Sequence, residues 1–170
     1  AAILDATAGP APGDPYFAPP PARPFLEEVG TDPGVLRIGF SHGGATGART
    51  DGEHARVLDE AVSVLQGLGH EVVEADPPLD NGEMQEIFRT LMASNAAQAI
   101  RSHPTKGRLP EPGEVENVVA ATAAKGESVT GHDVFIAQGR MHQAARRMAA
   151  YHDSHDVLLI PGLGHMPPKL

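Results

Sequence analysis

The sequence contains no cysteine and no tryptophan, and only 4% of its residues are aromatic. Without cysteine, disulfides, thiolate catalysis and cysteine-based zinc sites are excluded. With so few aromatic side chains, we expect a core built from alanine, leucine and valine. Basic residues are also scarce, because 13 Lys and Arg stand against 22 Asp and Glu, a formal net charge of −9. A chain this acidic repels phosphate backbones, so we expect no nucleic-acid partner.

Long apolar runs are missing as well. No stretch approaches the roughly 20 apolar residues that a membrane helix needs, and no signal peptide is visible. We therefore expect no membrane partner and a cytoplasmic location. The 170 residues suffice for one domain with a core. Both ends nevertheless resemble cuts through a larger domain, so we expect a single partial domain over residues 1–170.

Proline is abundant near the N-terminus. Residues 1–9 have the pattern of a helix end, with Gly9 and Pro10 as stop signals. Residues 10–34 form a proline-rich arm, since seven prolines in residues 10–24 leave no room for a helix or a sheet there. This arm is either a linker or a surface strap. Its candidate anchors are Tyr16, Phe17 and Phe25.

Residues 35–76 have the pattern of a β-α-β unit. Leu36–Ser41 predicts a strand, Thr50 or Asp51 an N-cap, and Gly69 the end of the helix that follows. A second strand is predicted over Glu71–Glu74. Because crossovers of this kind join parallel strands, we expect the two strands to be parallel.

Residues 80–152 are predicted to be helices, and residues 156–161 a late strand. Asp80 with Glu83, and Thr130 with Asp133, have the spacing of helix N-terminal caps. The uncharged run after Asp156 predicts a fully buried strand. The fold class is therefore α/β, with a mixed, partly parallel sheet flanked by helices in the order β-α-β-α-α-α-β.

The first long helix carries an expected buried stripe that includes Ile87, Phe88, Met92 and Ile100. Asn95 interrupts this stripe with a polar amide. Two interpretations are open for Asn95, a hydrogen-bonded core amide and a contact to a ligand.

Local motifs do not assemble a catalytic set. The loop Gly43–Gly47 fits neither the dinucleotide pattern nor the P-loop, and no G-x-S-x-G elbow accompanies it. Ser41 and Ser128 have no evident base beside them. The histidines of His152–Asp156 have a spacing compatible with metal binding, but capping of a helix C-terminus is the simpler interpretation. We expect no metal and no cofactor.

Six segments stand in a recognisable order, and they are Leu4–Pro10, Gly13–Pro15, Leu36–Ser41, Asp51–Glu53, Leu68–Glu74 and Asp156–Pro161. Their order resembles the amidase signature family, over residues 3 to about 163. The family's late-strand motif is usually D-V-L-L-T-P-T, and this sequence has Ile160 and Gly162 where the two threonines stand.

The resemblance implies a hydrolase that cleaves carboxamide C–N bonds other than peptide bonds, without a cofactor. In that family a Ser, cis-Ser, Lys triad acts, and it lies upstream of the segment that Ala1–Pro10 resembles. The resemblance therefore implies an amidase fragment with an incomplete amidase-signature fold and no catalytic residue of its own, inactive when isolated. Its expected partner is a small-molecule amide, bound in the parent enzyme.

Two loops are implied as pocket walls, Ser41–Gly47 and Pro161–Gly164. Asn95, Pro161 and Gly162 are the substrate-binding candidates. An alternative function is a non-catalytic α/β ligand-binding or interaction module that uses the Gly43–Gly47 loop. A homo-oligomer that buries faces left bare by the cut is a further expectation.

Overall fold

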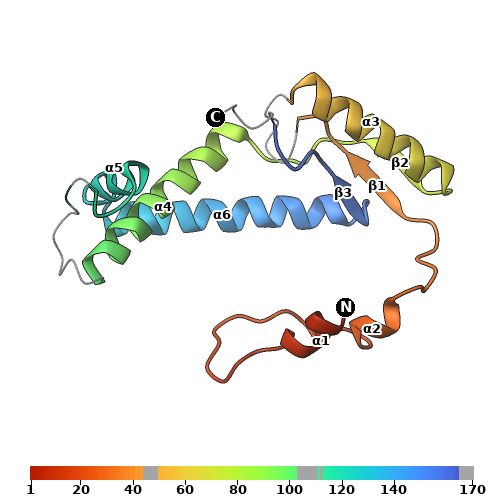
Figure 1. Cartoon of the computed structure of the whole chain (residues 1–170), viewed down its shortest axis with the longest axis horizontal. Helices are drawn as coiled ribbons and strands as arrows, with labels where there is room; N and C mark the ends of the chain where they lie inside the picture. The colour runs from red at the N-terminus through yellow and green to blue at the C-terminus, as the bar shows by residue number, and fades with distance from the viewer. Residues whose placement is uncertain (44–49, 103–110, 112, 165–170) are drawn as a thin grey trace. The chain divides into compact units, whose positions relative to one another are not determined.

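The structure, a computed structural model, describes residues 1–43, 50–102, 111 and 113–164. The chain divides into two compact units, Ala1–Val35 and Leu36–Leu170 (Figure 1). Each unit is described by itself below. Within the described ranges, no helix combines the length and the apolar character needed to cross a bilayer.

The first unit contains two short helices, α1 (Ala2–Thr7) and α2 (Phe25–Glu28), and neither of them buries a residue. They are tied together by Asp5 of α1, whose carboxylate accepts hydrogen bonds from the backbone N–H groups of Phe25 (2.6 Å) and Leu26 (2.9 Å). The predicted helix end is confirmed, since α1 stops at Thr7. The helix α2 was not expected inside the 10–34 arm.

The aromatic residues of the proline-rich arm do not act as buried anchors. Tyr16 is 87% exposed and Phe17 is 69% exposed, whereas Phe25 is half-buried. Only Phe25 of the three proposed anchors is half-buried, and both interpretations of the arm, a linker and a strap, stay predictions.

The second unit is built on a sheet of three strands, β1 (Arg37–Phe40), β2 (Glu71–Glu74) and β3 (Val157–Leu159), in the order β2-β1-β3. Both pairings are parallel, with Ile38 opposite Val72 on one side and opposite Val157 on the other. The predicted α/β class and the parallel β-α-β unit are confirmed. Ile38, on the central strand, is only 2% exposed and is a main core residue.

The late strand is shorter and less buried than predicted. Val157 is 39% exposed, and Leu158 and Leu159 are half-buried. The prediction of a fully buried strand is therefore wrong for this chain. The reason is position, because β3 lies at an edge of the sheet, and an edge strand has a neighbour on only one side.

The helix α3 (Gly52–Gly67) connects β1 to β2 and follows its sequence signals closely. The Asp51 side chain accepts a hydrogen bond from the backbone N–H of His54 (3.0 Å), which confirms Asp51 as the N-cap. Leu58 and Val62, four residues apart, are buried on one face. Gly69 follows the helix with φ +91°, the left-handed conformation typical of a helix end.

Three further helices form an arm on the same unit: α4 (Asn81–Ser102), α5 (Asn117–Gly126) and α6 (Gly131–His152). In Figure 1, α5 lies beside α4 at the end of this arm that is remote from the sheet. The approach of α5 to α4 needs glycine, since a Cβ atom at Gly126 would lie 1.9 Å from the carbonyl oxygen of Ala93. The arm is therefore packed through small residues, which are Ala93, Ala97, Ala123, Ala137 and Ala144.

The caps of this arm were predicted well, but its buried stripe was not. Thr130 and Asp133 form a complete capping box on α6, and Asp80 Oδ1 accepts the backbone N–H of Glu83 (2.7 Å). The Glu83 carboxylate accepts a hydrogen bond from the Arg147 guanidinium at 2.5 Å, and not the reciprocal capping-box bond that the sequence predicted.

Phe88 is 64% exposed and Met92 is 42% exposed, so the prediction that they are buried is wrong in this structure. Ile87 and Ile100 are buried as predicted. Phe88 and Met92 lie on faces of α4 other than the one that presents the buried Ala93 and Ala97. The predicted stop of this helix at His103 and Pro104 lies outside the described residues.

Candidate functional site

The carboxyl edge of the sheet is the natural place for a site in this fold. From β1 the chain crosses by α3 to β2 on one side, and it later reaches β3 on the other side. In open α/β sheets, ligands bind outside the carboxyl ends of the parallel strands, where the strand order changes direction. Three segments meet here, Ser41–Gly43, the first turn of α3, and Pro161–Gly164.

Ser41 is completely buried at the end of β1. Its hydroxyl donates a hydrogen bond to Asp76 Oδ1 (2.5 Å) and accepts one from the backbone N–H of Gly43 (3.1 Å). Its backbone N–H donates to the carbonyl of Leu159 on β3 (3.1 Å). Ser41 therefore fixes the direction in which the chain leaves β1. Asp76 was not identified from the sequence, because it follows β2, 35 residues later.

His42 connects two elements at this edge. Its Nε2 lies 2.8 Å from Asp59 Oδ1 on α3, and its Nδ1 lies 3.5 Å from Glu74 Oε1 on β2. The hydrogen bond to Asp59 is the main reason that the pKa of His42 is raised above its ordinary value, and Glu74 adds to the effect. The carbonyl of His42 accepts a hydrogen bond from Thr50 Oγ1 (2.5 Å). None of these partners of His42 was predicted from the sequence.

The glycine loop itself was a candidate phosphate cradle or module site. Of Gly43–Gly47 only Gly43 lies within the described residues, so the rest of that hypothesis falls outside them. Most of the predicted pocket wall Ser41–Gly47 also lies outside the described residues.

The loop after β3 lies against the start of α3. The backbone N–H of Asp51 donates to the carbonyl of Gly164 (2.9 Å), which joins the two segments. A pocket of about 420 Å³ opens between them, and Pro161 and Gly162 line it. The structure thus brings these two predicted residues together with His54, which the sequence did not single out.

The third candidate, Asn95, lies on α4 and not around this pocket. Its side chain is exposed, whereas Ala93 and Ala97 on the same helix are buried. A residue two positions from Ala93 and two from Ala97 points to the opposite side of a helix. The core-amide interpretation of Asn95 is therefore wrong, and a ligand contact stays a prediction.

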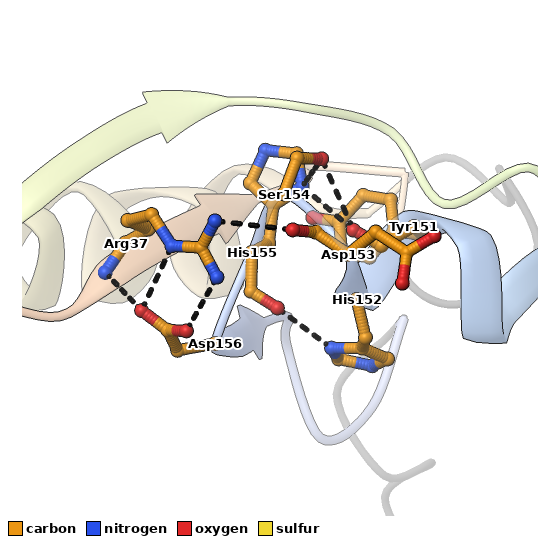
Figure 2. Close-up of polar contacts among 7 residues, drawn as sticks. All are labelled: Arg37, Tyr151, His152, Asp153, Ser154, His155 and Asp156. Carbon is orange, nitrogen blue, oxygen red and sulfur yellow. Dashed lines mark hydrogen bonds and ion pairs between the residues drawn. The ribbon is translucent and has the colours of Figure 1, made fainter.

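The cluster around His152–Asp156 ends α6 and attaches it to β1 (Figure 2). The ring nitrogen Nδ1 of His155 lies 3.1 Å from the Tyr151 carbonyl oxygen, and Ser154 Oγ donates to the same oxygen (3.2 Å). These contacts confirm the interpretation of the segment as a helix cap.

Arg37 completes this attachment from the strand. Its guanidinium pairs with Asp156 at 2.7 Å and donates to the carbonyl oxygen of Asp153 at 3.1 Å. The hydrogen bond from Arg37 lowers the pKa of Asp156 to about 2. Among the residues that the structure describes, no group of three or more His, Asp or Glu side chains is placed to hold a metal ion.

A larger pocket, of about 710 Å³, lies within the first unit. Its walls are prolines and exposed aromatics, including Tyr16 and Phe17. Its two carboxylates already accept backbone N–H groups, Asp5 from α2 and Asp14 from Ala11 at 2.7 Å. The carboxylates of this pocket are therefore already hydrogen-bonded within the unit, and a ligand would meet mainly its apolar wall. The pocket at the sheet edge is the stronger candidate for a functional site.

Comparisons with known proteins cover the whole chain. A family model described as amidase matches residues 1–170. A Synechocystis sp. protein whose name marks it as a candidate amidase is 29% identical over 171 residues, which are 100% of this chain and 31% of that protein. The 6-aminohexanoate-cyclic-dimer hydrolase of Pseudomonas sp. is 25% identical over 174 residues, 100% of this chain and 35% of that protein. The chain thus spans about a third of the length of these relatives.

Solved structures give the same picture. The structure of a 6-aminohexanoate cyclic dimer hydrolase complexed with substrate is similar with a TM-score of 0.84 at 26% identity, over 98% of this chain and 36% of that one. A bacterial aryl acylamidase of the amidase signature family shares the fold, with a TM-score of 0.70 at 17% identity over 86% of this chain and 31% of that one.

Proposed function

The chain belongs to the amidase family, and from this premise we propose that it forms part of a hydrolase that cleaves carboxamide C–N bonds. The observation that supports the proposal most is the likeness to the cyclic dimer hydrolase, which extends over 98% of this chain with a TM-score of 0.84. The relatives are about three times as long, so the activity proposed here is that of a longer protein.

The chemistry is assigned to residues outside this chain. Lys125, the lysine within the described residues, lies in the last turn of α5. Ser128 donates its hydroxyl to the carbonyl oxygen of that same residue (2.8 Å), which is a helix-end contact. Ser41 donates to a carboxylate and not to a base of the family type. We therefore place the Ser, cis-Ser, Lys triad in the part of the parent enzyme that this chain does not contain.

This chain contributes a wall of the substrate pocket. Pro161 and Gly162 are rigid and small, respectively, and they line the pocket at the carboxyl edge of the sheet. Asn95 is not part of this pocket lining, and a hydrogen bond from its exposed amide on α4 to an amide substrate is a separate prediction. Because the relative from Pseudomonas sp. is a 6-aminohexanoate-cyclic-dimer hydrolase, we propose an aliphatic amide as substrate.

The test compares two proteins, the chain alone and the complete gene product that contains it. The substrates are the 6-aminohexanoate cyclic dimer and hexanamide, and the measurement is the release of new amine or ammonia. We expect hydrolysis by the longer protein and none by the chain alone. Hydrolysis by the chain alone that disappears in Ser128→Ala would overturn the assignment of the catalytic residues.

A homo-oligomer stays part of the proposal. It is supported by large apolar side chains on the surface of α4 and α6, among them Phe88 and Phe135, which are 64% and 75% exposed. Light scattering of the complete protein tests it, and a monomer at micromolar concentration would contradict it. The cytoplasmic location stays a prediction from the sequence.

A further inference from the structure

A pocket of about 310 Å³, here called the Phe88 pocket, opens on the helical arm of the second unit between α4 and α5 (Figure 1). Ala93 is buried there, whereas Phe88 and Met92 are exposed. These two large side chains are therefore accessible to a ligand, and they give the pocket an apolar wall. None of its lining residues belongs to the pocket at the sheet edge. The lining residues are Phe88, Arg89, Thr90, Met92, Ala93, Thr122, Lys125 and Val129.

Two basic side chains line this pocket, Arg89 from α4 and Lys125 from α5, and no acidic one does. Arg89 donates from Nε to the carbonyl oxygen of Gln85 (3.2 Å) and from a terminal nitrogen to Gln85 Oε1 (3.4 Å), and both acceptors are uncharged. The Lys125 ammonium group makes no hydrogen bond or ion pair with any residue that the structure describes. Both cations therefore lack a counter-charge from the described part of the chain.

Unpaired cations are exceptions in a chain with a formal net charge of −9. Six arginines within the described ranges pair with a carboxylate, and they are Arg23, Arg37, Arg56, Arg101, Arg140 and Arg147. Three basic side chains of the same ranges make no ion pair, and these are Arg89, Lys125 and Arg146. Two of the three line the Phe88 pocket, and Arg146 lies on α6 outside it. Charge complementarity therefore favours an anionic ligand at this pocket.

Two other pockets on the same arm show the ordinary arrangement. In one of them Arg101 pairs with Glu127, and both residues line the pocket. In the other Arg140 pairs with Glu86 (2.6 Å), again within the lining. A ligand anion would have to displace a carboxylate of the chain from either pocket. At the Phe88 pocket no such exchange is needed.

We propose that the Phe88 pocket binds a small carboxylate with an apolar tail, with the carboxylate on Arg89 and Lys125 and the tail against Phe88 and Met92. The planar guanidinium offers N–H donors that match the two carboxylate oxygens, and the ammonium group adds a second positive charge. Burial of the tail against the apolar wall supplies the rest of the affinity. A volume of about 310 Å³ is near the lower end for ligand sites, about 300–1,000 Å³, which favours a small molecule. The inference is independent of the proposed amidase activity, because its residues lie outside the pocket at the sheet edge.

The experiment uses the 170-residue chain and four probes, each kept below the concentration at which it forms micelles: octanoate, octylammonium, 1-octanol and acetate. NMR follows the Met92 methyl and Thr122 amide signals, and the His54 and Gly162 amides report on the pocket at the sheet edge. We expect octanoate to shift the first pair saturably, with a Kd in about the millimolar range. Acetate lacks the tail and the other two probes lack the anion, so all three should bind more weakly. Raising the ionic strength to about 0.5 M should weaken octanoate binding, because exposed charges are screened.

Two charge variants test the carboxylate contact. Arg89→Gln and Lys125→Gln should each weaken octanoate binding about two- to fivefold, as expected for one partly exposed ion pair. Arg146→Gln is the matched control, because it removes the third unpaired cation from a position outside the pocket, and it should bind as the unchanged chain does.

A second pair of variants tests the apolar contact. Phe88→Ser removes an aromatic side chain that is 64% exposed, so we expect the fold to persist and octanoate binding to weaken about two- to fivefold. Phe135→Ser, at a 75% exposed position on α6, is the control and should leave binding unchanged. The amide spectrum of each variant shows whether it is folded.

Equal affinity for octanoate and octylammonium, or for octanoate and 1-octanol, would overturn the proposal. So would the absence of a saturable shift, which is also the result expected if a homo-oligomer covered Phe88. If Arg146→Gln weakened binding as much as Lys125→Gln, overall charge and not this pocket would explain the attraction, and the proposal would fail. None of these readouts involves hydrolysis, so they leave the proposed amidase function to its own assay.

Discussion

Different kinds of interaction stabilise the interior of each of the two compact units of this chain. In Ala1–Val35 neither helix buries a residue, and the contacts are polar, such as the Asp5 carboxylate on α2 and the Arg23–Glu28 pair. In the unit that starts at Leu36, a sheet and four helices bury an apolar core. Because exposed polar contacts contribute little and apolar burial contributes much, the second unit should unfold cooperatively and the first should open locally.

The comparison is tested most strongly by removing apolar volume from each unit. Ile38→Ala deletes a 2%-exposed side chain in the central strand, and we expect it to lower the free energy of unfolding by about 2–5 kcal/mol. Leu26→Ala, at a position 59% exposed in the first unit, should change it by less than about 0.5 kcal/mol. Urea unfolding followed by circular dichroism measures both. Similar losses for the two variants would contradict the difference between the units.

A second test concerns the close helix contact of the second unit. Gly126→Ala places a methyl group against the Ala93 carbonyl, and we expect a loss of about 1–3 kcal/mol in unfolding free energy. Gly139→Ala is the matched control on α6, because its Cβ meets no atom within 4 Å, and it should stabilise the chain by about 0.5–1 kcal/mol. Thermal unfolding distinguishes the signs. If Gly126→Ala left the free energy of unfolding unchanged, α5 would be free to move away from α4.

A third test breaks the polar tie of the first unit. Asp5→Ala removes the acceptor for two N–H groups of α2, and we expect the local opening free energy there to fall by about 0.5–2 kcal/mol. Hydrogen exchange at the Phe25 and Leu26 amides measures it. Glu27→Ala, an exposed change on the same helix, serves as the control. Faster exchange at Ile38 in the Asp5 variant would show that the units are coupled.

The smallest expected effect comes from pH. The pKa of Asp156 is about 2 in the folded chain, below its ordinary value near 4, so its pairing with Arg37 stabilises the fold above about pH 4. This stability should be lost as the pH falls from about 4 through 2. Asp156→Asn should flatten that part of the acid unfolding curve, and carboxyl NMR should show the low pKa directly. An ordinary pKa at Asp156 would show that its pairing with Arg37 does not stabilise the fold in this pH range.

Local signals in the sequence predicted local structure. Asp51 and Thr130 cap their helices because a cap depends on neighbours three residues away. The parallel pairing of β1 and β2 followed from a single crossover helix. Burial was predicted less well, since the exposure of Phe88 and of Val157 depends on which surfaces other segments cover. Sequence spacing carries no information about that.

The candidate site shows the same limit. Pro161 and Gly162 were identified through the family resemblance, and the structure places them on a pocket. His54 was missed, because its role depends on meeting a loop more than a hundred residues later in the chain. Asp51 gave one hint, because a carboxylate three residues before a histidine can orient the imidazole as well as cap the helix.

The long sequence separation between the central strand β1 and its neighbour β3 affects how the chain folds during synthesis. Arg37 on β1 meets Asp156, beside β3, across 119 residues of chain. A ribosome adding about 5–20 residues per second takes roughly 6–24 seconds to deliver that partner. During this interval the edge of the nascent β1 that later pairs with β3 has not yet received its partner strand.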